Sequence, residues 1–123
     1  IPKRPYLNIH GFLSDQEYLG ILQSCNFALL SLEDGGSSNS LLEISSCGLP
    51  VVITEMPNIK DYLLTPFSIT VPKNNSVQFA ADCIRLMENE HERGFLAREA
   101  RKNALLFDWI NIKDHFLQIL KNI

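Results

Sequence analysis

The sequence predicts an α/β fold, in which a Rossmann-like parallel sheet of about four strands is flanked by helices and followed by a helical C-terminal end. Short apolar runs alternate with segments of helical spacing up to residue 71, and only helical spacing follows from residue 76. Residues 26–32 form a nearly continuous apolar run, which is typical of a strand covered by helices on both faces. Strands separated by helices of this length run parallel, with right-handed crossovers.

The composition indicates a single domain. The chain has 123 residues, 46% of them hydrophobic, which suffices for one compact core but hardly for two. We expect one domain over residues 1–123, and a partial one, because residues 1–5 offer no start-like context. The formal net charge of -3 gives no general attraction for polyanions, which excludes nucleic acid as an expected partner.

The expected location is the cytoplasm. The sequence has no apolar run of about 18 residues and no signal-peptide pattern. Its three cysteines suit neither a zinc site nor a disulfide framework, so we expect reduced thiols.

The N-terminal part predicts a strand, a helix and a second strand. Residues 6–10 form a short apolar run that is closed by a glycine. Ser14 and Glu17 have the spacing of a capping box, and apolar residues then recur at helical spacing to about residue 24. Residues 26–32 supply the second strand.

A Gly/Ser-rich loop separates this strand from a short helix at residues 40–47. Gly48 can supply the left-handed residue that ends the helix, and Pro50 prevents its continuation. The third strand is therefore expected at residues 51–54.

The rest of the chain predicts one more strand and several helices. One or two helical turns are expected at residues 58–64, and a fourth strand at residues 67–71. Helical spacing then continues in three segments, at about residues 76–89, 90–107 and 111–121.

The loop and helix after the second strand have the features of a phosphate and sugar site. Ligands on doubly wound sheets lie beyond the carboxyl ends of the strands, which here means residues 10–12, 31–39 and 54–56. Gly35 and Gly36 allow backbone to approach a ligand closely.

The helix after this loop adds two further features. Residues 37–40 lead into a helix start, whose dipole attracts an anion such as a diphosphate. Glu43, one turn into the helix, can accept two hydrogen bonds from a vicinal diol such as a ribose.

A structural explanation stands beside this functional one. Ser40 and Glu43 also have the spacing of a capping box, in which the carboxylate only accepts from the Ser40 backbone N–H. Spacing alone favours this explanation at least as much as ribose binding, and the two roles could alternate.

The order of several short motifs resembles the C-terminal domain of retaining, GT-B-fold glycosyltransferases of the group 1 type. The resemblance covers most of the chain, and its order makes it fairly specific. The matching segments are residues 10–12, 25–31, 38–43, 47–52, 57–61 and 107–109.

The resemblance implies roles for individual residues. Glu43 matches the family's second acidic residue, which holds the donor ribose. The loop positions that contact the donor sugar through backbone amides are Gly36, Ser37 and Ser38, and the diphosphate-facing helix start is Asn39 and Ser40. The loop that contacts the nucleobase is His10, Gly11, Phe12 and Leu13, although His10 is equally explained as a strand-end residue with a satisfied imidazole.

Two departures from the family pattern leave the catalytic residues unassigned. The family spaces its two acidic residues eight apart, and that position here is Gly35, so Glu33 and Asp34 are both candidates for the first acidic role. The family's upstream Arg and Lys, which neutralise the diphosphate, and its acceptor-binding N-terminal domain have no counterpart in these residues.

The implied function is transfer of a sugar from a nucleotide diphosphate-sugar donor to an acceptor hydroxyl with retention. The helix amides would stabilise the charge of the leaving nucleotide diphosphate. The implied partners are the donor and the missing N-terminal domain, and we expect this fragment alone to bind without turnover. No metal site and no cofactor other than the donor substrate are expected.

Two surface features allow other contacts. Basic and acidic residues alternate on the expected helix at residues 90–107 and indicate a solvated face, with peripheral membrane contact as a weaker alternative. Apolar residues in the last two helices would dock onto the sheet or the missing domain, and any left exposed can support self-association.

Two alternatives come from other functional classes. A sugar-nucleotide epimerase or a phosphorylase on the same scaffold would have similar nucleotide or phosphate contacts. A non-catalytic α/β protein-interaction module is less favoured in its receiver-like form, because the expected strand ends carry no acidic cluster.

Overall fold

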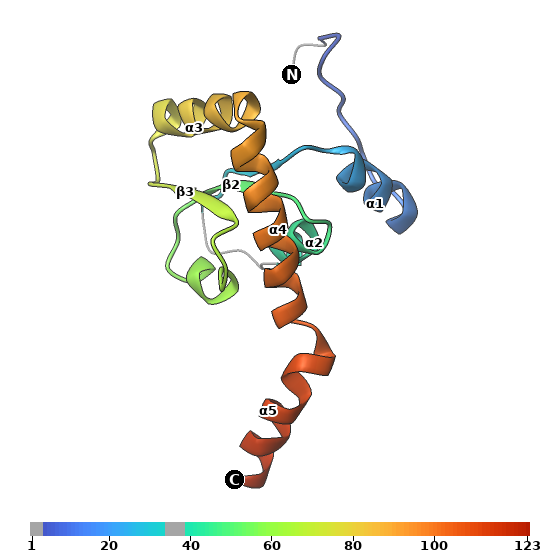
Figure 1. Ribbon diagram of the computed structural model, residues 1–123. Helices are drawn as coiled ribbons and strands as arrows, with labels where there is room; N and C mark the ends of the chain where they lie inside the picture. Colours follow the sequence, from blue (N-terminus) through green and yellow to red (C-terminus); the bar gives the residue numbers. More distant parts are fainter. Residues whose placement is uncertain (1–3, 34–38) are drawn as a thin grey trace.

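The computed structural model describes residues 4–33 and 39–123 and shows three parallel strands flanked by helices (Figure 1). The strands are β1 (Ala28–Leu30), β2 (Val51–Thr54) and β3 (Ser68–Val71), and they lie in the order β1-β2-β3. Both neighbouring pairs are parallel, with Ala28 opposite Val51 and Val51 opposite Ser68. The α/β class, the parallel sheet and the helical C-terminal end are thus confirmed.

The helices follow the sequence prediction closely. They are α1 (Asp15–Ser24), α2 (Asn39–Ser46), the 3-10 turn η1 (Ile59–Tyr62), α3 (Ser76–Glu88), α4 (Glu90–Leu106) and α5 (Trp109–Lys121). The predicted capping box starts α1, where the Ser14 Oγ accepts from the Glu17 N–H and the Glu17 carboxylate accepts from the Ser14 N–H.

Strand β2 is the centre of the core, because helices cover both of its faces. On one face Val51 and Ile53 join a cluster that includes residues of α2 and α4. On the other face Val52 packs with Leu86 of α3 and Leu96 of α4. All four residues of β2 are buried, as expected for a central strand of a parallel sheet.

The turn between α2 and β2 has the predicted glycine cap. Gly48 has φ 68°, in the left-handed region that favours glycine. The Gly48 N–H donates to the Ser45 carbonyl and the Leu49 N–H donates to the Ile44 carbonyl, which is the Schellman pattern. This cap ends α2 and directs the chain into β2.

The predicted strand at residues 6–10 is wrong, since these residues form no strand. The segment runs as exposed, irregular chain away from the sheet (Figure 1), and Tyr6 is 76% exposed. An apolar run becomes a strand only when another strand pairs with its backbone. Among the described residues none lies beside this segment to do so.

The strand predicted at residues 26–32 is present but shorter and less covered than expected. It is limited to the three residues of β1, and Leu29 is 53% exposed. Within the described chain β1 pairs with β2 alone, so it is an edge strand with one face partly open.

The segment between η1 and β3 is fixed by a buried amide on α4. Asn103 is fully buried, and its Oδ1 accepts from the backbone N–H groups of Leu64 and Thr65 at 2.8 and 3.2 Å. Its Nδ2 donates to the Tyr62 carbonyl at 3.0 Å. One side chain therefore satisfies three backbone groups of an irregular segment.

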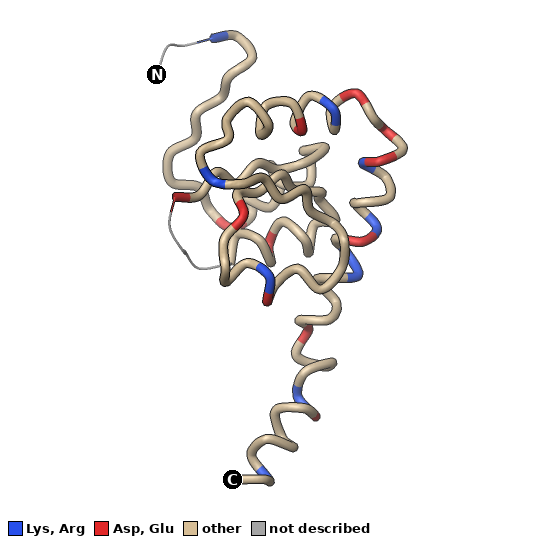
Figure 2. Tube along the Cα trace, turned by 90° about the vertical axis from the view of Figure 1, so that its left-hand side faces the viewer, with Lys and Arg blue, Asp and Glu red and all other residues tan. Residues whose placement is uncertain are grey.

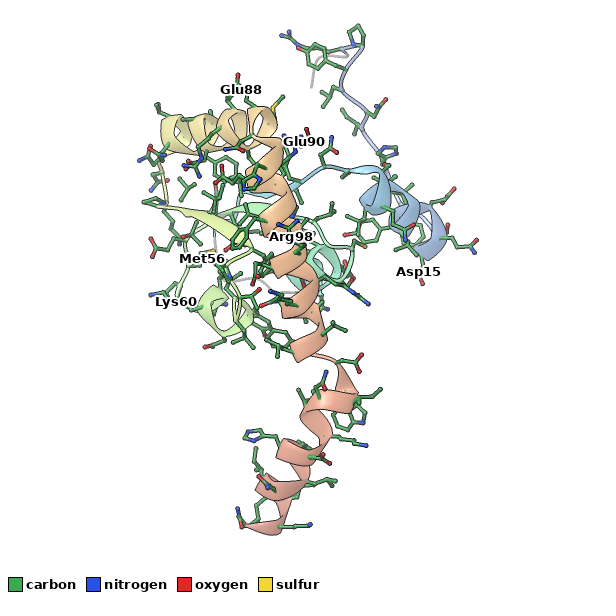
Figure 3. The ribbon with its side chains drawn as sticks, in the orientation of Figure 1. Asp15, Met56, Lys60, Glu88, Glu90 and Arg98 are labelled. Carbon is green, nitrogen blue, oxygen red and sulfur yellow. The ribbon has the colours of Figure 1, made fainter. Side chains whose placement is uncertain are left out.

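Side chains around η1 divide between the core and the surface. Met56 is 3% exposed and points inward, whereas Lys60 on η1 points away from the body of the molecule (Figure 3).

Two arginines of α4 bond to the ends of neighbouring helices. Arg93 donates to the Leu86 and Met87 carbonyls near the end of α3, and Arg101 donates to the Ser46 carbonyl at the end of α2. Such contacts satisfy the last carbonyls of a helix. The Glu99–Lys102 pair at 2.7 Å confirms local ion pairing on the same helix.

The last helix leaves the body of the molecule. In Figure 1, α5 extends away from the sheet, and none of its residues is buried. The expected docking is therefore limited to earlier residues, chiefly Leu96, which is buried, and Phe107, whose ring stacks on Tyr62 at 6.0 Å. No helix in the described ranges combines the length and the apolarity needed to cross a membrane.

Candidate functional site

The carboxyl ends of the three strands meet beside a pocket with a volume of about 740 Å³. Leu29, Phe79 and Ile84 give it an apolar wall between β1 and α3. Polar groups at its strand-end rim include Ser31, Glu33, Thr54, Lys73 and Asn75. We call this the edge pocket.

The chain leaving β1 is held at the edge pocket by one side chain of β2 and one from the connection after β3. The Leu32 N–H donates to the Thr54 Oγ1 at 3.1 Å, and the Lys73 Nζ donates to the Glu33 carbonyl at 2.9 Å. Thr54 is only 7% exposed, whereas Lys73 and Glu33 lie at the surface. Residues at the ends of β2 and β3 thus fix the first residues of the loop after β1.

Several predicted site residues lie outside the described residues. These are Asp34, Gly36, Ser37 and Ser38.

The start of α2 differs from the structural alternative considered for Glu43. The helix begins at Asn39, so Ser40 lies inside its first turn rather than at the cap. No hydrogen bond joins the described residues Ser40 and Glu43, so their predicted capping box is not formed. Asn39 and Ser40 are both exposed at this helix start.

Glu43 is exposed and lines a second hollow, with a volume of about 340 Å³, between α2 and the end of α4. Arg101, Phe107 and Asp108 line the same hollow. Glu33 instead lines the edge pocket, so the structure places Glu33 and Glu43 in different hollows.

A tyrosine of α1, Tyr18, interacts with Glu43. Burial raises the pKa of the Tyr18 hydroxyl, and interaction with the Glu43 carboxylate raises that pKa further. The neutral hydroxyl can donate a hydrogen bond to a carboxylate, whereas the phenolate cannot.

The residues of the predicted nucleobase loop line neither of these two hollows. His10, Gly11 and Phe12 are exposed and Leu13 is half-buried, in the irregular chain just before α1. Neither the edge pocket nor the Glu43 hollow has any of them in its lining.

Sequence reasoning missed the contributions of Thr54, Lys73 and Tyr18. Thr54 was within an expected strand-end segment, so its polar side chain after three apolar residues was an available signal. Lys73 and Tyr18 carry no such signal, because their importance depends on contacts with residues 40 and 25 positions away in the sequence.

The cysteines are free thiols, and the described acidic and histidine residues form no metal cluster. Cys25, Cys47 and Cys83 form no disulfide. The pKa of the Cys83 thiol is raised chiefly by burial and further by the nearby Asp82 carboxylate. Within residues 4–33 and 39–123, no group of three or more His, Cys, Asp or Glu could hold a metal ion.

Comparison with known protein families finds one that matches this chain. The family model described as "Glycosyl transferases group 1" matches residues 3–89. The matched range includes β1, β2 and β3, the helix α2, and the residues Glu33 and Glu43. The chain belongs to the group 1 glycosyltransferase family. No curated protein matches it.

Proposed function

We propose that this chain belongs to the donor-binding, C-terminal domain of a retaining glycosyltransferase with the GT-B fold. The single observation that carries the proposal is the family match over residues 3–89, which spans the sheet, the loop after β1 and α2. The donor is a nucleotide diphosphate-sugar, and the reaction is transfer of its sugar to an acceptor hydroxyl.

Glu43 holds the ribose of the donor in this proposal. Its carboxylate is exposed on α2 and is not used in a capping box, so both oxygens can accept from a vicinal diol. The Tyr18 hydroxyl beside it leaves this capacity largely intact, because a carboxylate offers about four acceptor positions.

The start of α2 binds the diphosphate. A helix of eight residues with Asn39 and Ser40 in its first turn directs its positive end toward the loop after β1. When the glycosidic bond breaks, negative charge grows on the departing diphosphate, and helix amides at this end stabilise it.

Glu33 and Asp34 remain the candidates for the first acidic role. Glu33 lies at the rim of the edge pocket, where the strands end. Gly36, Ser37 and Ser38 contact the donor sugar through backbone amides, and residues 10–13 contact the nucleobase.

The test is nucleotide binding by Glu43→Gln. Glutamine keeps the size of the side chain but lacks the second carboxylate oxygen, so it loses the bidentate acceptor. UDP, GDP and ADP, each also as its glucose conjugate, are titrated by ligand-detected NMR. We expect binding of at least one of them, weakened about tenfold by the substitution, which is the usual size of a charged hydrogen-bond contribution.

The matched control is Glu88→Gln, which changes an exposed carboxylate at the end of α3, away from α2 (Figure 3). It should bind like the wild type. Both variants should keep the thermal midpoint, since both side chains are exposed. Equal nucleotide binding by Glu43→Gln and the wild type would remove Glu43 from the ribose site.

A further inference from the structure

We propose that Thr54 and Lys73 are positioning residues of the donor site, which fix the exit of β1 so that Glu33 is held at the rim of the edge pocket. This inference rests on the proposed function, because it concerns the same site. It adds two residues outside the loop and helix on which that proposal depends.

The Thr54 contact is built into the sheet. Thr54 is the last residue of β2 and the only polar residue of that strand, and it is 7% exposed. Its Oγ1 accepts the N–H of Leu32, two residues past the end of β1. A buried N–H without an acceptor is costly, so this bond favours one path for the chain leaving β1.

The Lys73 contact comes from the next connection in the sheet. Lys73 follows β3, and its ammonium group donates to the carbonyl of Glu33, the residue after Leu32. In Figure 2 the connection between β3 and α3 passes beside the described chain that leaves β1. The ends of all three strands are thus joined at the first residues of the loop.

The connection that carries Lys73 is itself constrained. Pro72 precedes it and has a fixed φ. Asn74 has φ 59°, a left-handed conformation that asparagine tolerates better than most residues. Asn75 then caps α3 by accepting from the Gln78 N–H at 3.0 Å. The backbone on both sides of Lys73 is therefore constrained. The hydrogen bond to Glu33 then has to order little more than the Lys73 side chain.

The positioning effect follows from these contacts. Because catalytic and binding groups must be held closely to their productive geometry, a flexible exit from β1 would lower donor affinity. Neither Thr54 nor Lys73 has to touch the donor for this effect.

The experiment uses two matched pairs of variants in the 123-residue chain. Thr54→Val keeps the shape but removes the acceptor, and Thr54→Ser keeps the hydroxyl. Lys73→Met keeps the apolar stem but removes the donor, and Lys73→Arg keeps donor and charge. Lys121→Met, at the end of α5, controls for loss of one positive charge.

The readouts are NMR titrations with UDP, GDP and ADP, and the backbone resonances of Leu32 and Glu33. We expect Thr54→Val and Lys73→Met each to weaken binding about three- to tenfold, the usual effect of one lost hydrogen bond. Thr54→Val should shift the Leu32 amide proton and Lys73→Met the Glu33 carbonyl carbon. Thr54→Ser, Lys73→Arg and Lys121→Met should bind like the wild type.

The outcomes separate the two proposals. Wild-type nucleotide binding that Thr54→Val and Lys73→Met leave unchanged would overturn the positioning roles and leave the proposed function standing. Weakened binding that Ser and Arg do not restore would also overturn them. Binding of none of the three nucleotides by the wild type would overturn the proposed function, and the positioning roles with it.

Discussion

At the scale of single residues, the contact between Tyr18 and Glu43 links α1 to the proposed ribose site. Tyr18 is 36% exposed, and its pKa is raised first by burial and then by the Glu43 carboxylate. The raised pKa means that the neutral hydroxyl is favoured in the folded state. Its contribution to stability is present below the ordinary pKa of 10.0 and is lost as pH rises through the folded-state pKa.

This contact predicts a pH titration. The ring resonances of Tyr18 should titrate with a midpoint above 10.0, and Glu43→Gln should lower that midpoint without fully restoring the ordinary value, because burial also raises the pKa. NMR spectra recorded against pH measure both midpoints. A midpoint that Glu43→Gln leaves unchanged would show that the carboxylate does not act on the hydroxyl, and Glu88→Gln serves as the control.

Only part of the candidate site could be predicted at this scale. Glu43 and the start of α2 are proposed as site residues from residue type and spacing along one segment. Thr54 and Lys73 act on the exit of β1 through tertiary contacts, which depend on the order and register of the strands. A sequence pattern contains no direct record of such contacts.

At the scale of elements, Asn103 is the side chain on which the connection from η1 to β3 depends most. It is fully buried on α4 and makes three hydrogen bonds to the backbone between residues 62 and 65. No apolar residue of similar size could satisfy these groups.

Asn103→Ala should therefore destabilise the fold strongly. We expect the free energy of unfolding to fall by about 3 kcal/mol, since two backbone N–H groups lose their acceptor in a buried place and a cavity forms. Urea unfolding followed by circular dichroism measures the loss. Asn122→Ala, at the exposed end of α5, is the comparison and should change the free energy of unfolding by less than about 0.5 kcal/mol. A similar, small loss for both variants would contradict the assigned role.

Elements with explicit start and stop signals were predicted well, and the exception is informative. The Ser14–Glu17 capping box predicts the start of α1, and Gly48 predicts the end of α2, because both signals act within a few residues. The run at residues 6–10 had the composition of a strand, but strand formation requires a neighbouring strand. That requirement cannot be read from five residues.

At the scale of the whole molecule, α5 lies outside the two core clusters of the folded body. The body has two core clusters on the faces of β2, whereas α5 buries none of its residues. Apolar side chains of α5 that are at least half exposed include Trp109, Ile110, Ile119 and Leu120.

Removal of residues 109–123 should leave the body folded. We expect the thermal midpoint to change by no more than about 3 °C, because little buried surface is lost. The shortened chain should also self-associate less than the full chain, since a large exposed apolar surface favours association. Differential scanning calorimetry and light scattering measure the two effects. A large drop in the midpoint would show that α5 stabilises the body.

The fold class was predictable at this scale because a parallel sheet imposes a simple order on the sequence: strand, helix, strand. The number of strands was not, since it depends on which apolar runs find partners. The degree of cover over each strand was equally hidden, as the half-open β1 shows.

The position of β1 at the side of the sheet has a consequence for its peptide groups. The Ala28 N–H donates to the Pro50 carbonyl, toward β2. Because peptide groups alternate along a strand, the amide of Leu29 faces the opposite way, where the described chain offers it no acceptor. The amide proton of Leu29 should therefore exchange with solvent deuterium much faster than the amide proton of Ala28.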